Sequence, residues 1–112
     1  MKPLYRIRKT QDGDFYWIFQ MKNNRTSLTS KTYISHDECV ESVKISKDHL
    51  DKNCNLIIKK TENNKYYFNQ ITDHGEELAR SIYYANRQGA KKSIQIMIED
   101  APTAKILENK KC

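Results

Sequence analysis

The sequence contains little glycine and little proline, with three glycines and two prolines in 112 residues. This argues against a disordered or low-complexity chain, because such chains are usually rich in these residues. The glycines are also scattered, at positions 13, 75 and 89, so the chain has no glycine-rich phosphate-binding loop. We therefore expect a folded chain that holds no nucleotide in this way.

Cysteines and long apolar segments are scarce as well. Cys39, Cys54 and Cys112 are an odd number of cysteines, and the first residues lack the apolar segment of a secretory signal. No run approaches the roughly 20 apolar residues that a membrane helix needs. Together these features predict a protein of the reducing cytoplasm, where thiols stay reduced.

The sequence does contain an internal repeat, at an ungapped offset of 51 positions. Identical residues that coincide at this offset are Ile7 with Ile58, Tyr16 with Tyr67, Ser30 with Ser81, Tyr33 with Tyr84, Ser42 with Ser93, and Ile45 with Ile96. Because all of these identities share one ungapped offset, chance does not explain them well. We predict a single domain over 1–112, with repeat one at 4–51 and repeat two at 55–102.

Each repeat has the pattern of three short strands followed by a helix. In the clearest strand, Phe15, Trp17 and Phe19 alternate with the residues between them, which is the period of two of a pleated strand. The matching strand of repeat two carries Gln70 on the corresponding face. The pattern therefore predicts a more polar and wetter face there.

The helices are marked by their caps and their apolar stripes. Ser35 and Glu38 have the spacing of a capping box, and Asn86 takes the cap position in repeat two. Pro102 predicts the end of the second helix, because the residue before a proline disfavours helical geometry. In the first helix Ser46 interrupts the apolar stripe, so we expect this helix to dock less closely.

These elements predict an α+β fold made of two tandem βββα(β) repeats. One unit is too small to bury its own sheet and helix, so we expect both units to form one antiparallel sheet with both helices packed on one face. A pseudo-twofold axis would relate them. Residues 104–108 are expected to form a last strand that corresponds to 54–58. Because the repeats are fused, we expect a monomer, with a homodimer as the alternative.

Several motifs carry a family resemblance. They are Phe15-Tyr16-Trp17-Ile18-Phe19, Ser30-x-x-Tyr33, Ser81-x-x-Tyr84-x-Asn86 and Asp100-Ala101-Pro102-x-Ala104. On these motifs the chain resembles the YegP-like family, whose members contain tandem repeats of a bacterial domain of unknown function. The resemblance covers nearly the whole chain. The resemblance implies the fold but no active site, because the motifs are structural. Ser42 and Ser93 depart from that family, which usually has glycine at mid-helix.

Metal binding and catalysis have weak support. His36, Cys39, His49 and Cys54 are residues of the type that bind zinc, which takes about four nitrogen or sulfur ligands. However, Cys39 coincides with Ala90 at the repeat offset and lies on the apolar stripe, so burial explains it. No cysteine or serine has a base visible beside it in the sequence. We predict no metal, no cofactor and no enzymatic activity.

Nucleic-acid binding is the alternative function. The chain has a net charge of +6, and Tyr16 and Tyr67 lie on the strand face opposite Trp17 and Phe68. Aromatic rings among cations can stack bases while the cations neutralise phosphates, without sequence preference. A solvated basic surface with half-buried tyrosines explains the same residues. The candidate contact residues are Arg6, Arg8, Tyr16, Lys59, Lys60, Tyr67, Arg87, Lys91 and Lys92.

Protein binding is the leading function by elimination, which makes the chain a small non-enzymatic cytoplasmic interaction module. Ile45 and Ile96 share a repeat position roughly opposite the apolar stripe. They either meet each other across the two helices, which we favour, or form an exposed patch for a partner protein.

Overall fold

The computed structural model describes residues 3–22, 25–50, 56–72, 74–100 and 104–108. In chain order the elements are β1 (Leu4–Lys9), β2 (Phe15–Gln20), β3 (Thr26–Ser30), α1 (His36–His49), β4 (Leu56–Lys60), β5 (Tyr66–Ile71), β6 (Glu77–Ser81), α2 (Arg87–Asp100) and β7 (Lys105–Glu108). The alternation and capping patterns predicted strands and helices at these places. The α+β class is confirmed.

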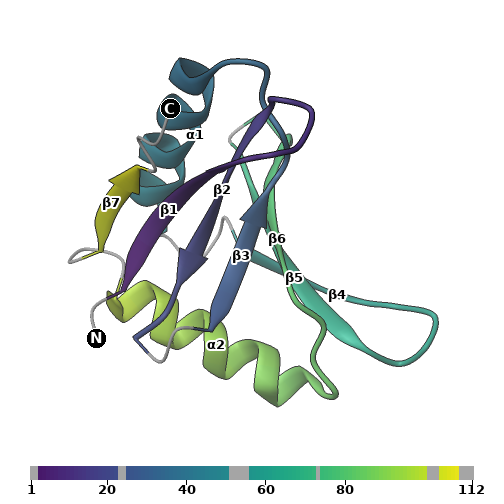
Figure 1. The fold of residues 1–112 in the computed structure, drawn as a ribbon. Helices are drawn as coiled ribbons and strands as arrows, with labels where there is room; N and C mark the ends of the chain where they lie inside the picture. The colour runs from purple at the N-terminus through teal and green to yellow at the C-terminus, as the bar shows by residue number, and fades with distance from the viewer. Residues whose placement is uncertain (1–2, 23–24, 51–55, 73, 101–103, 109–112) are drawn as a thin grey trace.

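The strands form one seven-stranded mixed sheet in the order β4-β5-β6-β3-β2-β1-β7, with β3 and β6 at its centre (Figure 1). The prediction of a wholly antiparallel sheet is wrong at one edge, because β7 pairs parallel with β1. A parallel pair needs a long crossover connection, and the rest of the chain between β1 and β7 supplies it. Because β3 pairs with β6, the sheet runs through both halves of the chain.

The hairpin turns place residues with positive φ where the strands reverse. Gly13 has a φ of 91°, Asn64 of 64° and Gly75 of 84°. Glycine reaches this region without steric cost and asparagine tolerates it, so these residues permit tight reversals. The turn at Gly75 brings Thr72 and Glu76 to one end of the sheet, where both line a groove beside α1.

Both helices begin at the predicted caps. The Ser35 hydroxyl accepts the backbone N–H of Glu38 at 3.1 Å, and the side chain of Asn86 accepts that of Gly89 at 2.8 Å. The second helix ends at Asp100, ahead of Pro102. In the part of the chain that the structure describes, neither helix is long and apolar enough to span a membrane.

Both helices pack on the same face of the sheet, as predicted. The indole N–H of Trp17 in β2 donates to the Ser42 hydroxyl of α1 at 2.9 Å. A bulge in the β2–β3 pairing turns Ser27 towards this face, where its hydroxyl contacts the sulfur of Met97 in α2. Large side chains that are fully buried between sheet and helices are Tyr5, Trp17, Phe19, Leu28, Leu50 and Phe68. We call the other side of the sheet the open face.

A buried trio, Tyr5, Ser46 and Gln70, links β1, α1 and β5. The Ser46 hydroxyl donates to Gln70 Oε1 at 2.6 Å and therefore accepts the Tyr5 hydroxyl at 2.9 Å. Gln70 Nε2 also donates to the Ser46 carbonyl at 3.0 Å. All three side chains have no exposed surface, and burial raises the pKa of Tyr5 well above its usual range.

The trio corrects two predictions. The strand face that carries Gln70 is dry rather than wet, and α1 docks closely at Ser46 rather than loosely. Hydrogen bonds within the trio satisfy these polar groups, which removes most of the cost of burying them.

Candidate functional site

A groove lies between α1 and the turn between β5 and β6, and we call it the α1 groove. Its volume is about 530 Å³. It is lined by Lys31, Thr32, Tyr33 and Ile34 ahead of α1, by Glu38, Glu41, Ser42 and Ile45 on α1, and by Thr72, Glu76 and Leu78 around the turn. The groove thus combines surfaces from both halves of the chain.

The floor of the α1 groove is rigid and largely apolar. The Tyr33 hydroxyl is 2.6 Å from the Ser42 hydroxyl, which also accepts the Trp17 indole N–H. The Tyr33 backbone is bonded to Phe15 by two hydrogen bonds, of 2.6 and 2.8 Å. Since both ends of Tyr33 are held, the ring is preorganised beside Ile45.

The rim of the α1 groove is acidic. Glu38, Glu41 and Glu76 line it with a single ammonium group, that of Lys31. Lys31 Nζ lies 3.5 Å from a Glu76 carboxylate oxygen and 5.8 Å from the centre of the Tyr33 ring. The exposed carboxylates therefore outnumber the cation, on a chain whose net charge is +6.

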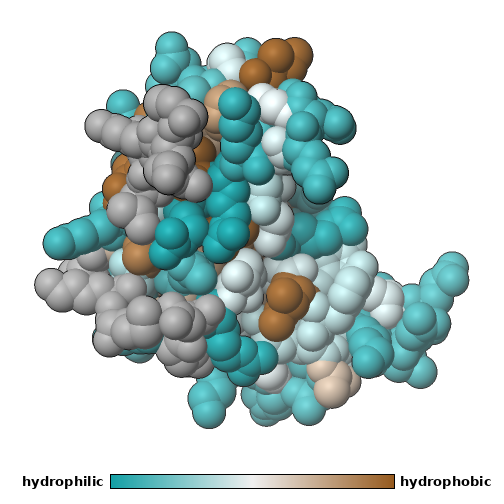
Figure 2. All heavy atoms as spheres, in the orientation of Figure 1, coloured by the Kyte–Doolittle hydropathy of each residue, from teal (hydrophilic) through white to brown (hydrophobic). Residues whose placement is uncertain are grey.

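An exposed apolar side chain also borders this groove. Ile34 is 82% exposed at the entry to α1, the largest exposed fraction among the exposed large hydrophobic side chains of the described residues. Figure 2 shows a mainly hydrophilic surface on which brown apolar areas are small and separate. The exposed side chain of Ile34 therefore adds apolar area at the edge of the α1 groove.

A second groove, the α2 groove, lies at the equivalent place of the other helix. Its volume is about 390 Å³. It is lined by Met21, Arg25, Thr26, Ile82, Tyr84, Gly89, Lys92, Ser93 and Ile96. The Tyr84 hydroxyl donates to the Ser93 hydroxyl at 2.8 Å, as Tyr33 contacts Ser42 in the α1 groove.

The two grooves differ in charge. At the 51-residue offset Glu41 corresponds to Lys92, and Glu76 corresponds to Arg25. The third carboxylate, Glu38, corresponds to Gly89. The same framework of tyrosine, serine and isoleucine therefore has an acidic rim on α1 and a basic rim on α2.

Each of the two grooves also contains one isoleucine of the repeat pair. Ile45 lines the α1 groove and Ile96 lines the α2 groove. The favoured hypothesis, that they meet across the helices, is therefore wrong, because each helix turns its isoleucine towards a groove of its own.

The predicted nucleic-acid contact residues divide between two sides of the molecule. Strand register places Arg8 opposite Tyr16 and Lys59 opposite Tyr67, all on the open face. Arg6 lies on the same face, and its Nε donates to Gln20 at 3.1 Å. Five of the candidate contact residues therefore lie on the open face.

The remaining candidates lie on the helix side. Lys60 is opposite Tyr66, whose ring lies 5.6 Å from the Arg87 guanidinium of α2. Lys91 and Lys92 also lie on α2 and are exposed. The candidate residues are thus not one continuous contact surface.

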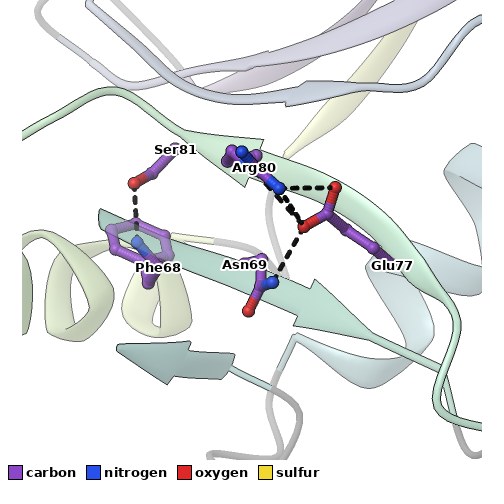
Figure 3. A network of polar contacts seen from close by, with 5 residues as sticks. All are labelled: Phe68, Asn69, Glu77, Arg80 and Ser81. Carbon is purple, nitrogen blue, oxygen red and sulfur yellow. Dashed lines mark hydrogen bonds and ion pairs between the residues drawn. The ribbon is translucent and has the colours of Figure 1, made fainter. Parts of the chain in front are cut away.

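A polar network covers part of the open face (Figure 3). The Arg80 guanidinium lies 4.8 Å from the centre of the Tyr67 ring and donates to Glu77 at 3.1 Å. Asn69 also donates to Glu77, at 2.8 Å. Burial acts to raise the pKa of Glu77, but hydrogen bonds from Asn69 and Arg80 outweigh it, and the pKa lies below its usual value.

The residues considered for zinc are not brought together as a set. The His36 ring packs edge-on against Phe15 at 5.5 Å, and His49 Nδ1 is 2.8 Å from the Ile45 carbonyl. Cys39 is fully buried, and Cys54 lies outside the described residues. Within the described ranges no three histidine, cysteine, aspartate or glutamate residues gather in a metal-binding group.

Sequence reasoning missed the acidic rim of the α1 groove. Its carboxylates come from α1 and from a turn of the other half, so they are separated in sequence. One signal was available: Glu41 and Glu76 coincide with cations at the repeat offset. A charge reversal between otherwise matched positions points to a surface on which the two halves differ.

Comparison with known proteins agrees with the resemblance drawn from the motifs. The family model described as "Domain of unknown function (DUF1508)" matches residues 62–108. The chain is 22% identical over 102 residues to a UPF0339 protein of Mannheimia succiniciproducens, covering 91% of this chain and 90% of that one. It is 23% identical over 108 residues to a UPF0339 protein in the ptx operon 5′ region of Stutzerimonas stutzeri, covering 96% and 97%.

Two solved structures share the fold. The solution NMR structure of YegP from E. coli, a protein of unknown function, matches with a TM-score of 0.89 at 21% identity, covering 97% of this chain and 94% of that one. A UPF0339 protein from Shewanella oneidensis matches with a TM-score of 0.88 at 18% identity, covering 96% and 92%. The chain is thus YegP-like in fold and similar to the DUF1508 and UPF0339 proteins.

Proposed function

We propose that this chain is a non-enzymatic interaction module of the cytoplasm, and that its α1 groove binds a basic, partly apolar segment of another protein. The observation that carries the proposal is a preorganised apolar floor inside a rim of three carboxylates. Peptide-binding grooves combine these features, since apolar pockets supply affinity and charges at the rim supply selectivity.

The groove is built to bind with little reorganisation. Tyr33 is held by its backbone and by its hydroxyl, so binding would not have to order it. Ile34, already exposed at the rim, would bury apolar area against the partner. These properties favour an extended segment that places an apolar side chain on the floor.

The charge of the chain favours a basic segment at this site. The chain has a net charge of +6, so cations outnumber carboxylates over the molecule as a whole. In the α1 groove, Glu38, Glu41 and Glu76 reverse that balance, which favours a basic segment there.

The proposal of a non-enzymatic role rests on the hydroxyl in the groove wall. Ser42 is bonded to Trp17 and Tyr33, two neutral groups that fix it in place. A nucleophilic serine needs a base that removes its proton and a third group that orients the base. The partners of Ser42 favour a structural role for it.

The test is fluorescence anisotropy with a labelled short peptide of alternating lysine and leucine, at about 150 mM salt, where charges more than about 8 Å apart are screened. We expect saturable binding to the intact chain. Glu41→Lys should weaken it by about tenfold, because it replaces an attraction at the rim by a repulsion.

The matched control is Lys92→Glu, the reverse exchange at the equivalent position of the α2 groove. It should leave the affinity for the basic peptide within about twofold. A gain in affinity from Lys92→Glu equal in size to the loss from Glu41→Lys would show that only net charge matters, and an absence of binding to the basic peptide would contradict the proposal.

Nucleic-acid binding through the open face is the second candidate. One observation favours it: in both halves a cation lies directly opposite a tyrosine across the strands, Arg8 with Tyr16 and Lys59 with Tyr67. Against it, Arg80 already covers the Tyr67 ring. If this candidate were right, labelled single-stranded RNA would bind with an affinity that falls steeply with salt and drops in Tyr16→Ala with Tyr67→Ala.

We further propose that the two halves are tandem βββα(β) repeats related by a pseudo-twofold axis. Together the two repeats would make up nearly the whole of this YegP-like chain. Paired local contacts support it. The backbone N–H of Trp17 donates to Ser30 Oγ at 2.9 Å, and that of Phe68 donates to Ser81 Oγ at 2.9 Å. An experimental structure would test it by superposition of residues 5–49 on 56–100.

A further inference from the structure

The two first strands of the halves differ in their neighbours. β1 pairs with β2 on one side and with β7, in parallel, on the other. β4, which corresponds to β1 at the repeat offset, pairs with β5 and forms the outer edge of the sheet (Figure 1). Among the described residues, no strand takes the place beside β4 that β7 takes beside β1.

The hydrogen-bonding direction of β4 follows from the turn that ends it. The Thr61 N–H donates to the Lys65 carbonyl across the hairpin at 2.8 Å. Backbone groups of an antiparallel strand alternate in direction, so those of Ile57 and Lys59 point to β5. Those of Leu56, Ile58 and Lys60 then point outwards, away from the sheet.

In β1 the outward backbone groups have a partner, because β7 lies beside this strand. Thr10 donates to Asp14 across the first hairpin, so the alternate residues Tyr5 and Ile7 point to β7. The Lys105 N–H donates to the Pro3 carbonyl at 3.4 Å, and Lys47 Nζ of α1 donates to the Ala104 carbonyl at 2.6 Å. β7 thus shows how a parallel strand adds to this framework.

The side chains along β4 define what an added strand would meet. Ile57 is 42% exposed on the open face, and Ile58 is half-buried on the helix side. Lys59 and Lys60 are exposed at the end of the strand. The counterpart of Lys47 in α2 is Ile98, a half-buried apolar residue. The edge is therefore apolar where β4 begins and cationic where it ends.

We propose that the β4 edge binds an extended segment of another protein as an added parallel strand, with apolar residues first and carboxylates beside Lys59 and Lys60. Addition of a strand to an exposed sheet edge gives affinity through backbone hydrogen bonds and selectivity through alternate side chains. The outward N–H groups of Ile58 and Lys60 are the donors that the added strand uses. This surface is separate from the α1 groove.

A second copy of the chain fits this edge less well. Two β4 strands that pair antiparallel would bring Lys59 and Lys60 of one copy beside the apolar beginning of the other. Ammonium groups would then be partly desolvated against isoleucine and leucine without an anionic partner. A segment that ends in carboxylates avoids this cost.

The test uses a peptide that repeats the sequence of residues 104–108 and ends in further glutamates, added to the intact chain. Residue-resolved amide hydrogen exchange reports the outcome. At about 90% occupancy, exchange at Ile58 and Lys60 should slow by about tenfold, because only the unbound molecules exchange. The amides of Ile57 and Lys59, already bonded to β5, should change little.

Two variants at one position isolate the backbone contribution. Lys60→Ala removes the charge and keeps the N–H, whereas Lys60→Pro removes both and is tolerated at an outward position of an edge strand. Lys60→Pro should bind the peptide about fivefold more weakly than Lys60→Ala, the value of about one hydrogen bond.

Three results would overturn the proposal. The first is unchanged exchange at Ile58 and Lys60 when the peptide is in excess. The second is altered exchange at Tyr5 and Ile7 instead, since the peptide would then have replaced β7. The third is protection of Ile58 that rises with protein concentration alone, which would identify a second copy as the occupant. None of these results affects the α1 groove, whose peptide and variants are different.

Discussion

The two halves of the molecule place the same elements in the same order but fill equivalent positions with different chemistry. The buried trio is polar: Tyr5, Ser46 and Gln70 hydrogen-bond to one another without contact with water. Its counterparts at the 51-residue offset are Leu56, Met97 and Phe19, all apolar and all buried. The same buried positions therefore accept either a hydrogen-bonded set of side chains or an apolar set.

The surfaces differ in the same manner. The grooves beside α1 and α2 have matching tyrosine, serine and isoleucine residues but opposite charge at the rim. The strands β1 and β4 also match, yet only β1 has a parallel neighbour in the described chain. At the grooves, identical residues form the framework, and residues that differ between the halves set the charge of the rim.

The largest expected effect comes from breaking the buried trio. Ser46→Ala leaves the Tyr5 hydroxyl and Gln70 Oε1 buried without their partner, so we expect a loss of about 2 to 3 kcal/mol of unfolding free energy. Urea denaturation measures it. Lys44→Ala, an exposed site on the same helix, is the control and should cost less than about 0.5 kcal/mol.

Replacing the trio by its apolar counterparts tests whether its three side chains act as a unit. The combined variant Tyr5→Leu, Ser46→Met, Gln70→Phe should lose less stability than the sum of the three single changes, because it removes every buried polar group at once. Strictly additive losses would show that the three side chains do not act as a unit.

The next effect is on groove selectivity. Glu41→Lys with Glu76→Arg gives the α1 groove the two cations of the α2 groove and leaves Glu38 and Lys31 in place. We expect the preference of this groove to invert, with about tenfold weaker binding of a lysine–leucine peptide and about tenfold tighter binding of a glutamate–leucine peptide. Anisotropy titrations of both peptides measure the change. An unaltered preference would mean that the rim does not select the partner.

The smallest effect concerns Glu77, whose counterpart is Thr26. Its folded-state pKa is lowered, so its contribution to stability is complete above the unfolded value of about 4.3 and is lost as the pH falls through the folded value. Because the carboxylate is partly exposed, we expect less than about 1 kcal/mol. Urea midpoints from about pH 6 to 3 should fall less for Glu77→Gln than for the parent.

Local patterns in the sequence were enough to predict the elements. Alternation at Phe15, Trp17 and Phe19 and the caps at Ser35 and Asn86 depend on residues close in sequence. The parallel pairing of β7 with β1 was not predictable in this way, because it joins the two ends of the chain. The burial of Ser46 escaped prediction for a similar reason, since its partners come from β1 and β5.

The same limit applies to the candidate site. Tyr16 and Tyr67 were placed correctly on the face opposite Trp17 and Phe68, because strand period alone decides that. The α1 groove depends on a turn of the second half approaching a helix of the first half. The pairing of β3 with β6, a contact between halves, helps to bring these segments together.

Binding in the α1 groove can be located by a two-dimensional NMR titration of the intact chain with the lysine–leucine peptide. We expect shifts of the amides of Tyr33, Ile34 and Ile45 around the α1 groove, with Tyr84 and Ile96 of the α2 groove unaffected. Shifts of equal size in both grooves, or shifts confined to the open face around Tyr16 and Tyr67, would contradict the claim that the acidic groove is the binding site.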